Sequence, residues 1–317
     1  MSFVPDAVKD LAVVRMVCHV DRREERASPA MTSTGSSSIA RGVVLMIVAM
    51  LIIPLVDGLA KFLSAGYSPL FLSWARYVVA CAIVLPVAAA YRGRRVFPAE
   101  RRVAHALRTV FLVISMTLYF MAIARIPLAT AVSAYFVGPI IAVVLSVPVL
   151  KESLTARKVL SLVLGFVGAL VILRPGATIE PGLLLAFGAG LSFALYIIAT
   201  RQAAQDSDPL QTLVFQCVVG ALLMTPQAVA SWTTPAWSDL VFFVGLGVFS
   251  AVGHILSIVA FRLADASTLA PLVYVELIGA AAIGYLVFHE VPGPGTLIGA
   301  ALIAAGGLIL LQRQRPA

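Results

Sequence analysis

Charged residues are scarce in this chain of 317 residues, at 12% of the total, whereas hydrophobic residues make up 61%. Soluble domains carry about a quarter charged residues. A soluble protein with this composition would need a core with almost no surface, so the composition excludes that class and favours a polytopic membrane protein. The net charge of +8 comes from short basic clusters between apolar runs, where membrane proteins place them. We therefore expect no binding of nucleic acid.

Cysteine is also rare, and the three cysteines (Cys18, Cys81 and Cys217) provide no disulfide framework. The sequence has no phosphate-binding P-loop motif, which indicates that ATP does not drive the protein directly. Its four histidines are scattered and form no H-E-x-x-H motif. We expect neither a metal nor a cofactor.

Residues 1–40 contain no apolar run of membrane length, and "SPAMTSTGSSS" is typical of a flexible segment. We expect 1–40 to be a flexible N-terminal tail. A second hypothesis is that translation begins at Met31.

The rest of the chain consists of apolar runs, each close to the 20 or so residues that cross a bilayer as a helix. These runs predict an all-α integral membrane protein with ten spans: 42–63, 69–91, 105–124, 128–150, 157–174, 181–200, 210–231, 238–261, 268–288 and 294–312. With the N-terminus in the cytoplasm, fourteen lysines and arginines fall on the inner side and three on the outer side. The positive-inside rule then predicts that both termini are cytoplasmic.

The chain also repeats itself at an offset of 138 residues. At this offset Glu152 aligns with Glu290, and Gly168 aligns with Gly306. Each repeat, 41–174 and 181–312, contains five predicted spans. Because five is odd, the second repeat starts on the opposite side of the membrane, which predicts an inverted repeat of the kind found in secondary transporters.

Two segments carry a family resemblance: "LYFMAIARIPLATAVSAYFVGPIIAVVLSVPVLKESLTARKVLSLVLGFVGALVILRPG" and "AFRLADASTLAPLVYVELIGAAAIGYLVFHEVPGPGTLIGAALIAAGGLILL". With them, the chain resembles the drug/metabolite transporter superfamily, with two EamA-type domains. The resemblance implies transport of a small metabolite. The segment "MLIIPLVDGLAKFLSAGYSPLFLSWARYVVA" is similar to branches associated with uptake of riboflavin or S-adenosylmethionine.

Two carboxylates, Glu152 and Glu290, lie between consecutive spans, near the membrane interface. Each can accept amide hydrogen bonds at the start of the following helix. We interpret both as structural caps, and a role in transport is the alternative.

Ionisable groups inside spans are expensive and are usually functional. Asp57 and Arg76 lie at similar depths on consecutive spans and are predicted to meet, and Lys61 can also bridge Asp57 from one turn away. The sequence leaves two interpretations of the Asp57–Arg76 pair: it has a function in transport, or it only fixes helix packing. Arg108, one turn inside its span, is expected to extend to the interface.

The second predicted pair is His254 with Glu276, again on consecutive spans. Histidine titrates near neutral pH, so this pair is a candidate proton relay or substrate anchor, and a buried hydrogen bond is the alternative. Four tyrosines in the middle of spans could enclose a planar substrate or only pack: Tyr119, Tyr135, Tyr196 and Tyr274.

These observations favour a secondary transporter of a small polar or amphipathic metabolite in the inner (plasma) membrane, driven by protons or by exchange. The expected partners are the small-molecule substrate, protons and the lipid bilayer, and a homodimer stays open. A membrane-embedded enzyme and a scaffold or sensor that does not transport are the alternatives. An enzyme would need a catalytic constellation, and a scaffold would need no ionisable groups at depth.

Overall fold

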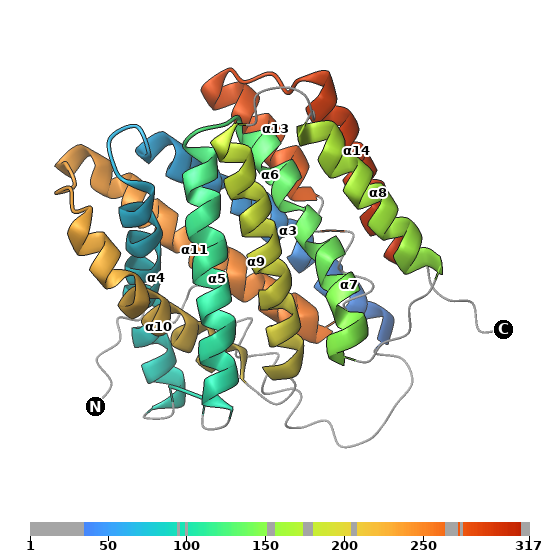
Figure 1. Cartoon of the computed structure of the whole chain (residues 1–317). Helices are drawn as coiled ribbons and strands as arrows, with labels where there is room; N and C mark the ends of the chain where they lie inside the picture. Colours follow the sequence, from blue (N-terminus) through green and yellow to red (C-terminus); the bar gives the residue numbers. More distant parts are fainter. Residues whose placement is uncertain are drawn as a thin grey trace.

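A computed structural model describes residues 35–93, 96–98, 101–150, 156–173, 180–203, 208–263, 272 and 275–311. Glu152, Tyr274 and Met31 lie outside these described residues. The described helices are α3 (Gly35–Leu63), α4 (Pro69–Arg92), α5 (Arg102–Ile123), α6 (Leu128–Tyr135), α7 (Val137–Leu150), α8 (Ala156–Leu173), α9 (Pro181–Ala203), α10 (Pro209–Ala230), the short 3₁₀ helix η1 (Trp237–Asp239), α11 (Leu240–Leu263), α13 (Val275–Phe288) and α14 (Pro294–Leu311) (Figure 1). Helix α3 begins at Gly35, before the predicted boundary at residue 41.

Proline sets the start of several of these helices. It is the first residue of α4, α9, α10 and α14, a position at which its missing N–H removes no helical hydrogen bond. Two of these starts are also capped by a side chain. Ser68 accepts a hydrogen bond from Leu70 N at 3.3 Å, and Asp208 accepts one from Leu210 N at 2.8 Å. The helix boundaries therefore follow from local sequence.

Six described segments are long and apolar enough to cross a membrane, judged by length and composition: Ala40–Leu63, Pro69–Tyr91, Arg102–Ile123, Pro181–Ala199, Leu210–Ala230 and Trp237–Ser257. Four shorter apolar helical segments are Leu128–Ala142, Val163–Ile172, Val275–Phe288 and Pro294–Gly306. The structure is thus the all-helical membrane protein expected. The count of ten spans stays a prediction for the four shorter segments.

The polarity of the bundle is reversed relative to that of a soluble protein. Large apolar side chains are exposed along its outside, including Leu222, Ile278 and Leu286, each about 70% exposed. Charged groups, among them Asp57, Arg76 and Arg108, are instead buried. This distribution suits a lipid surround, because apolar side chains face the lipid and polar groups find partners inside the protein.

The helix contacts occur in matched pairs. Helix α3 packs against α11 and α13, and α9 packs in the corresponding way against α5 and α7. Helix α4 packs against α10, and α8 lies beside α14 along one edge of the bundle (Figure 1). Two five-helix halves related by a two-fold axis would produce this pattern. Consecutive helices α3 and α4 share few contacts, because α11 packs against both of them.

The predicted fourth span, 128–150, is divided into α6 and α7 at Phe136. Pro139 has no N–H, so the carbonyl of Tyr135 lacks its usual helical donor at this point. Helix α9 approaches the break closely. A Cβ added at Gly190 would lie 2.6 Å from Tyr135 O, and one added at Gly138 would lie 2.5 Å from Gly190 O. Glycine is therefore required at both positions of this backbone contact.

Candidate functional site

Two buried carboxylates lie where helices of both halves converge. Asp57 on α3 is 3% exposed, and Glu276, in the first turn of α13, is 6% exposed. The hydroxyl of Tyr119 on α5 donates to Asp57 Oδ2 at 3.1 Å. Helices α3 and α13 pack against each other, and the Asp57 charge acts on Glu276. The sequence did not predict this pairing of Asp57 with Glu276.

Glu276 accepts no hydrogen bond from the residues that the structure describes. Two carboxylates in one buried site repel each other when both are ionised. A proton, or a cationic group of a ligand, would relieve this repulsion. The arrangement can therefore bind either one, and the two would compete for the same oxygen atoms.

A row of aromatic rings extends from this acidic site. The ring centroids of Tyr119 and Tyr135 are 5.1 Å apart, and those of Tyr135 and Phe193 are 5.0 Å apart. Phe193 stacks on Tyr196 at 5.6 Å with an interplanar angle of 21°. Three of these rings were expected from the sequence to lie in mid-span. Phe193 was missed, because a phenylalanine in an apolar run carries no distinguishing signal.

Arg108 lies at the far end of this aromatic row, and the prediction that it extends to the interface is wrong. It is 2% exposed. One guanidinium nitrogen donates to Tyr196 Oη at 3.1 Å and to Gln216 Oε1 at 3.2 Å. The guanidinium carbon also lies 5.2 Å from the centroid of the Tyr196 ring. Gln216 was missed, although an amide inside an apolar run is itself a signal of a buried polar partner.

The structure describes both Arg76 and Asp57, and they do not form the predicted ion pair. They interact electrostatically only over a longer distance. Its guanidinium carbon lies 4.7 Å from the centroid of the Tyr77 ring and 5.5 Å from that of Phe120. The side chain is 3% exposed, and its Nε has no hydrogen-bond partner among the residues that the structure describes. The prediction failed because it assumed that consecutive helices are the closest neighbours.

The predicted pair of His254 and Glu276 is likewise not observed. Helix α11, which carries His254, and helix α13, which carries Glu276, both pack against α3. Among the described residues, Arg76 and Arg108 act electrostatically on His254, whereas Asp57 acts on Glu276. Within the part of the chain that the structure describes, His254 Nδ1 is buried and makes no well-formed hydrogen bond.

A second charged cluster closes one end of the bundle. Lys61 Nζ forms an ion pair with Glu290 Oε1 at 2.8 Å and donates to the carbonyls of Ile123 at 3.0 Å and Ile126 at 2.7 Å. Glu290 Oε2 accepts from Leu128 N at 2.9 Å. Glu290 thus caps α6, not the following helix α14 as expected, and Lys61 does not bridge Asp57. This Lys61–Glu290 cluster joins the ends of α3, α5, α6 and α13.

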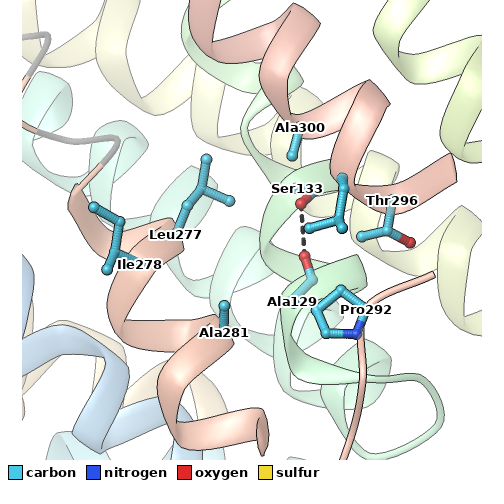
Figure 2. A pocket seen from close by; sticks show the side chains of 9 residues that line it. Ala129, Ser133, Leu277, Ile278, Ala281, Pro292, Thr296 and Ala300 are labelled. Carbon is cyan, nitrogen blue, oxygen red and sulfur yellow. Dashed lines mark hydrogen bonds between the residues drawn. The ribbon is translucent and has the colours of Figure 1, made fainter. Parts of the chain in front are cut away.

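A groove of about 310 Å³ lies between α6, α13 and α14 (Figure 2). Apolar groups dominate its wall, and its residues are Ala129, Ser133, Leu277, Ile278, Ala281, Pro292, Thr296, Leu297 and Ala300. The Ser133 hydroxyl donates within its own helix to Ala129 O at 2.6 Å, and Thr296 bonds to Thr130 at 3.2 Å. The groove therefore presents almost no free polar group. We place the candidate site at the buried charges and the aromatic row instead.

The chain is similar to known transporters over most of its length. The sequence model of the EamA-like transporter family matches residues 40–174 and, a second time, residues 180–312. The chain is 26% identical over 260 residues to the S-adenosylmethionine uptake transporter of Rickettsia prowazekii, covering 82% of this chain and 88% of the relative. It is 27% identical over 282 residues to the riboflavin transporter of Vibrio cholerae, covering 86% and 93%. A solved crystal structure with 20% identity shares the fold at a TM-score of 0.63, covering 85% of this chain and 96% of that chain.

Proposed function

Because the chain belongs to the EamA-like transporter family, we propose that it is a secondary active transporter of a small metabolite in the inner membrane. It works by alternating access, in which two inverted halves exchange conformations around a central site. The matched helix contacts support this proposal, since two halves of similar packing can adopt each other's arrangement. The break between α6 and α7 supports it as well, because irregular backbone at membrane depth usually lines a binding cavity.

The observation that carries the proposal is the composition of the central site. Asp57 and Glu276 lie at one end of the aromatic row and Arg108 at the other. Charged side chains inside a membrane bundle are costly, and they usually mark a substrate or ion pathway. The aromatic rings between them offer faces on which a planar heterocycle can stack.

The buried charges favour a zwitterionic heteroaromatic substrate. S-adenosylmethionine, which the Rickettsia relative takes up, carries a sulfonium, an ammonium and a carboxylate on an adenine nucleoside. Riboflavin, the substrate of the Vibrio relative, has a planar ring but no charged group at neutral pH. Two buried carboxylates and two buried guanidiniums match the first molecule better. Riboflavin is the second candidate, and the aromatic row is the observation that favours it.

The carboxylates also suggest how transport is coupled. A substrate cation and a proton would compete for Asp57 and Glu276, because either one relieves the repulsion between the two anions. Release of the substrate on one side would leave the pair to take up protons for the return step. Such competition gives proton antiport, or exchange of one substrate molecule for another.

Flux measurements in proteoliposomes test the proposal. We expect counterflow of radiolabelled S-adenosylmethionine without a pH gradient and accumulation only with one. Glu276→Gln should abolish accumulation. Absence of flux of both S-adenosylmethionine and riboflavin above that of empty liposomes would contradict the proposed substrates. Chemical turnover of a ligand without its flux would instead indicate an enzyme, and binding without flux would indicate a sensor.

The orientation, with both termini in the cytoplasm, has its own test. A membrane-impermeant thiol reagent applied from outside should label a cysteine introduced at Gly293 and spare one introduced at Gly93. The opposite labelling pattern would overturn the orientation.

A further inference from the structure

We propose that Asp57 and Arg76 together bind the α-amino-acid end of the substrate, with its ammonium on the Asp57 carboxylate and its carboxylate on the Arg76 guanidinium. The inference rests on the proposed function, in which the central site binds the transported metabolite. It adds the chemical group that this part of the site recognises.

Arg76 is a buried cation in need of an anion. The side chain is 3% exposed, no carboxylate among the described residues forms an ion pair with it, and its Nε has no hydrogen-bond partner. Its guanidinium carbon lies over the rings of Tyr77 and Phe120, and the face of an aromatic ring attracts a cation but does not neutralise it as a carboxylate would. Buried polar groups without partners are rare in native structures, and such a group calls for an unseen ligand or water.

The same face of α4 offers a second donor. Ser73 lies one helical turn before Arg76, and its buried hydroxyl also lacks a hydrogen-bond partner in the described structure. Residues three positions apart lie on one face of a helix. A hydroxyl beside a guanidinium is a suitable pair of donors for a carboxylate.

Asp57 has the complementary unused capacity. Its carboxylate accepts one described hydrogen bond, from Tyr119 at 3.1 Å, whereas an ionised carboxylate can accept several. Lys61, one turn along the same helix, is occupied by Glu290 and two carbonyls. No described cation therefore forms an ion pair with Asp57, and an ammonium group could donate to this carboxylate.

The arrangement of these two residues favours a zwitterion. Both residues contact neighbouring positions of α5, since Tyr119 donates to Asp57 and the Arg76 guanidinium carbon lies 5.5 Å from the centroid of the Phe120 ring. The two nevertheless form no ion pair with each other. An α-amino acid carries an ammonium and a carboxylate on the same carbon, so one ligand group neutralises both residues. A simple cation would leave Arg76 without a partner, and a simple anion would leave Asp57 without one.

The aromatic row continues from this pair of charges. The Tyr119 hydroxyl that holds Asp57 belongs to the first ring of the aromatic row. A ligand anchored by its amino-acid end at Asp57 can therefore lay its heterocycle along Tyr135 and Phe193. This order, zwitterion and then planar ring, is the order of groups in S-adenosylmethionine.

The test compares ligands that differ only at this end, with binding measured by calorimetry on the purified full-length protein. S-adenosylmethionine should bind at least about 10-fold more tightly than its decarboxylated form and than 5′-methylthioadenosine, which lacks the amino-acid end. Arg76→Gln should remove the preference for S-adenosylmethionine over the decarboxylated form. Arg125→Gln, a substitution at an exposed arginine, should leave that preference unchanged.

A second panel separates failure of this inference from failure of the proposed function. It contains methionine and tyrosine, the amines obtained by decarboxylating them, and the corresponding acids without the amino group. One possible result is that no nucleoside binds, whereas the amino acids stabilise the protein against heat and their amines and acids do not. In that case the proposed substrate is wrong, but the subsite for an α-amino acid is supported.

Three results would overturn the subsite. One is equal affinity for S-adenosylmethionine and its decarboxylated form, and another is no binding of any α-amino acid in either panel. The third concerns the double variant Asp57→Asn with Arg76→Gln, which removes both charges and so leaves no buried charge unpaired. If this variant folds and binds S-adenosylmethionine as tightly as the natural sequence, Asp57 and Arg76 are only a packing pair bridged by water.

Discussion

The charged residues at the end of the bundle have more hydrogen-bond and ion-pair partners than those at its centre. At the end, Lys61 contacts one carboxylate and two carbonyls, and Glu290 contacts Lys61 and a backbone N–H. At the centre, Glu276 and the Nε of Arg76 have no hydrogen-bond partner in the described structure, and Asp57 has one. The central residues are also the more deeply buried, at 3–6% exposed, whereas Lys61 and Glu290 are only half-buried.

This difference separates two roles for an intramembrane charge. A charge whose partners are all within the chain holds helices together, and its removal leaves those partners unpaired. A buried charge without partners weakens the fold, so the protein retains it for something that binds there. Substitutions in the two regions should therefore have opposite effects on stability and on transport.

The largest effect is expected at Glu276. Glu276→Gln removes a buried charge that accepts no described hydrogen bond, so thermal stability should stay the same or rise. Transport should fall at least about 100-fold, because the amide can bind neither a proton nor a substrate cation in the same way. The measurements are the melting temperature and proteoliposome flux. The control is Glu180→Gln at an exposed glutamate, and lower stability with normal flux would reverse the assignment of Glu276.

At the end of the bundle the expectation is the reverse. Lys61→Met leaves Glu290 and two carbonyls without their cation and should lower the free energy of unfolding by roughly 2–3 kcal/mol. Substrate binding in the folded protein should change little. Denaturant unfolding and calorimetry measure the two quantities, and Arg125→Met is the matched control at an exposed cation. Loss of binding at unchanged stability would show that Lys61 belongs to the substrate site.

A charge exchange sharpens this prediction. Lys61→Glu combined with Glu290→Lys restores an ion pair but places a carboxylate against the carbonyls of Ile123 and Ile126 and an ammonium against Leu128 N–H. Like-signed partial charges then face each other, so the double variant should recover less than ~1 kcal/mol. Full recovery would mean that the ion pair alone stabilises this end and that the backbone contacts contribute nothing.

The same distinction explains what could be predicted from the sequence. Hydropathy and the 138-residue offset indicated a helical membrane protein with a repeat, and two segments resembled this family, because these signals are local or periodic. The depths of Asp57, Arg76 and Glu276 also marked them as buried charges. Their partners could not be predicted, because consecutive helices were assumed to be neighbours and α11 packs against both α3 and α4. Pairing across the bundle is a tertiary property that the order of spans does not encode.

Arg108 combines features of both regions, since it is deeply buried and yet hydrogen-bonded. Arg108→Lys keeps the charge, but a compact ammonium lacks the planar guanidinium that lies over the Tyr196 ring while one of its nitrogens donates to Tyr196 and Gln216. We expect a loss of roughly 1–2 kcal/mol in stability. In a Gln216→Leu background the same substitution should lower stability by less, because one hydrogen-bond acceptor of Arg108 is already absent. Additive losses in this double-mutant cycle would show that the contact between Arg108 and Gln216 contributes no coupling energy.

The smallest change compares one hydroxyl group in each region. At the end of the bundle, Tyr67 Oη donates to Asp239 Oδ2 at 2.7 Å and accepts from Ala236 N at 2.9 Å. At the centre, Tyr119 Oη donates to Asp57 alone at 3.1 Å. Tyr67→Phe should therefore lower stability by roughly 1–2 kcal/mol and leave the transport rate unchanged. Tyr119→Phe should change stability by less than ~1 kcal/mol but slow transport several-fold, because Asp57 loses the group that orients it towards the substrate. Both variants keep the ring and its packing, so a melting curve and a flux assay on the same preparations isolate the hydroxyl. If Tyr119→Phe lowers stability as much as Tyr67→Phe and leaves flux untouched, Asp57 is a structural acceptor, and the contrast between the two regions does not extend to it.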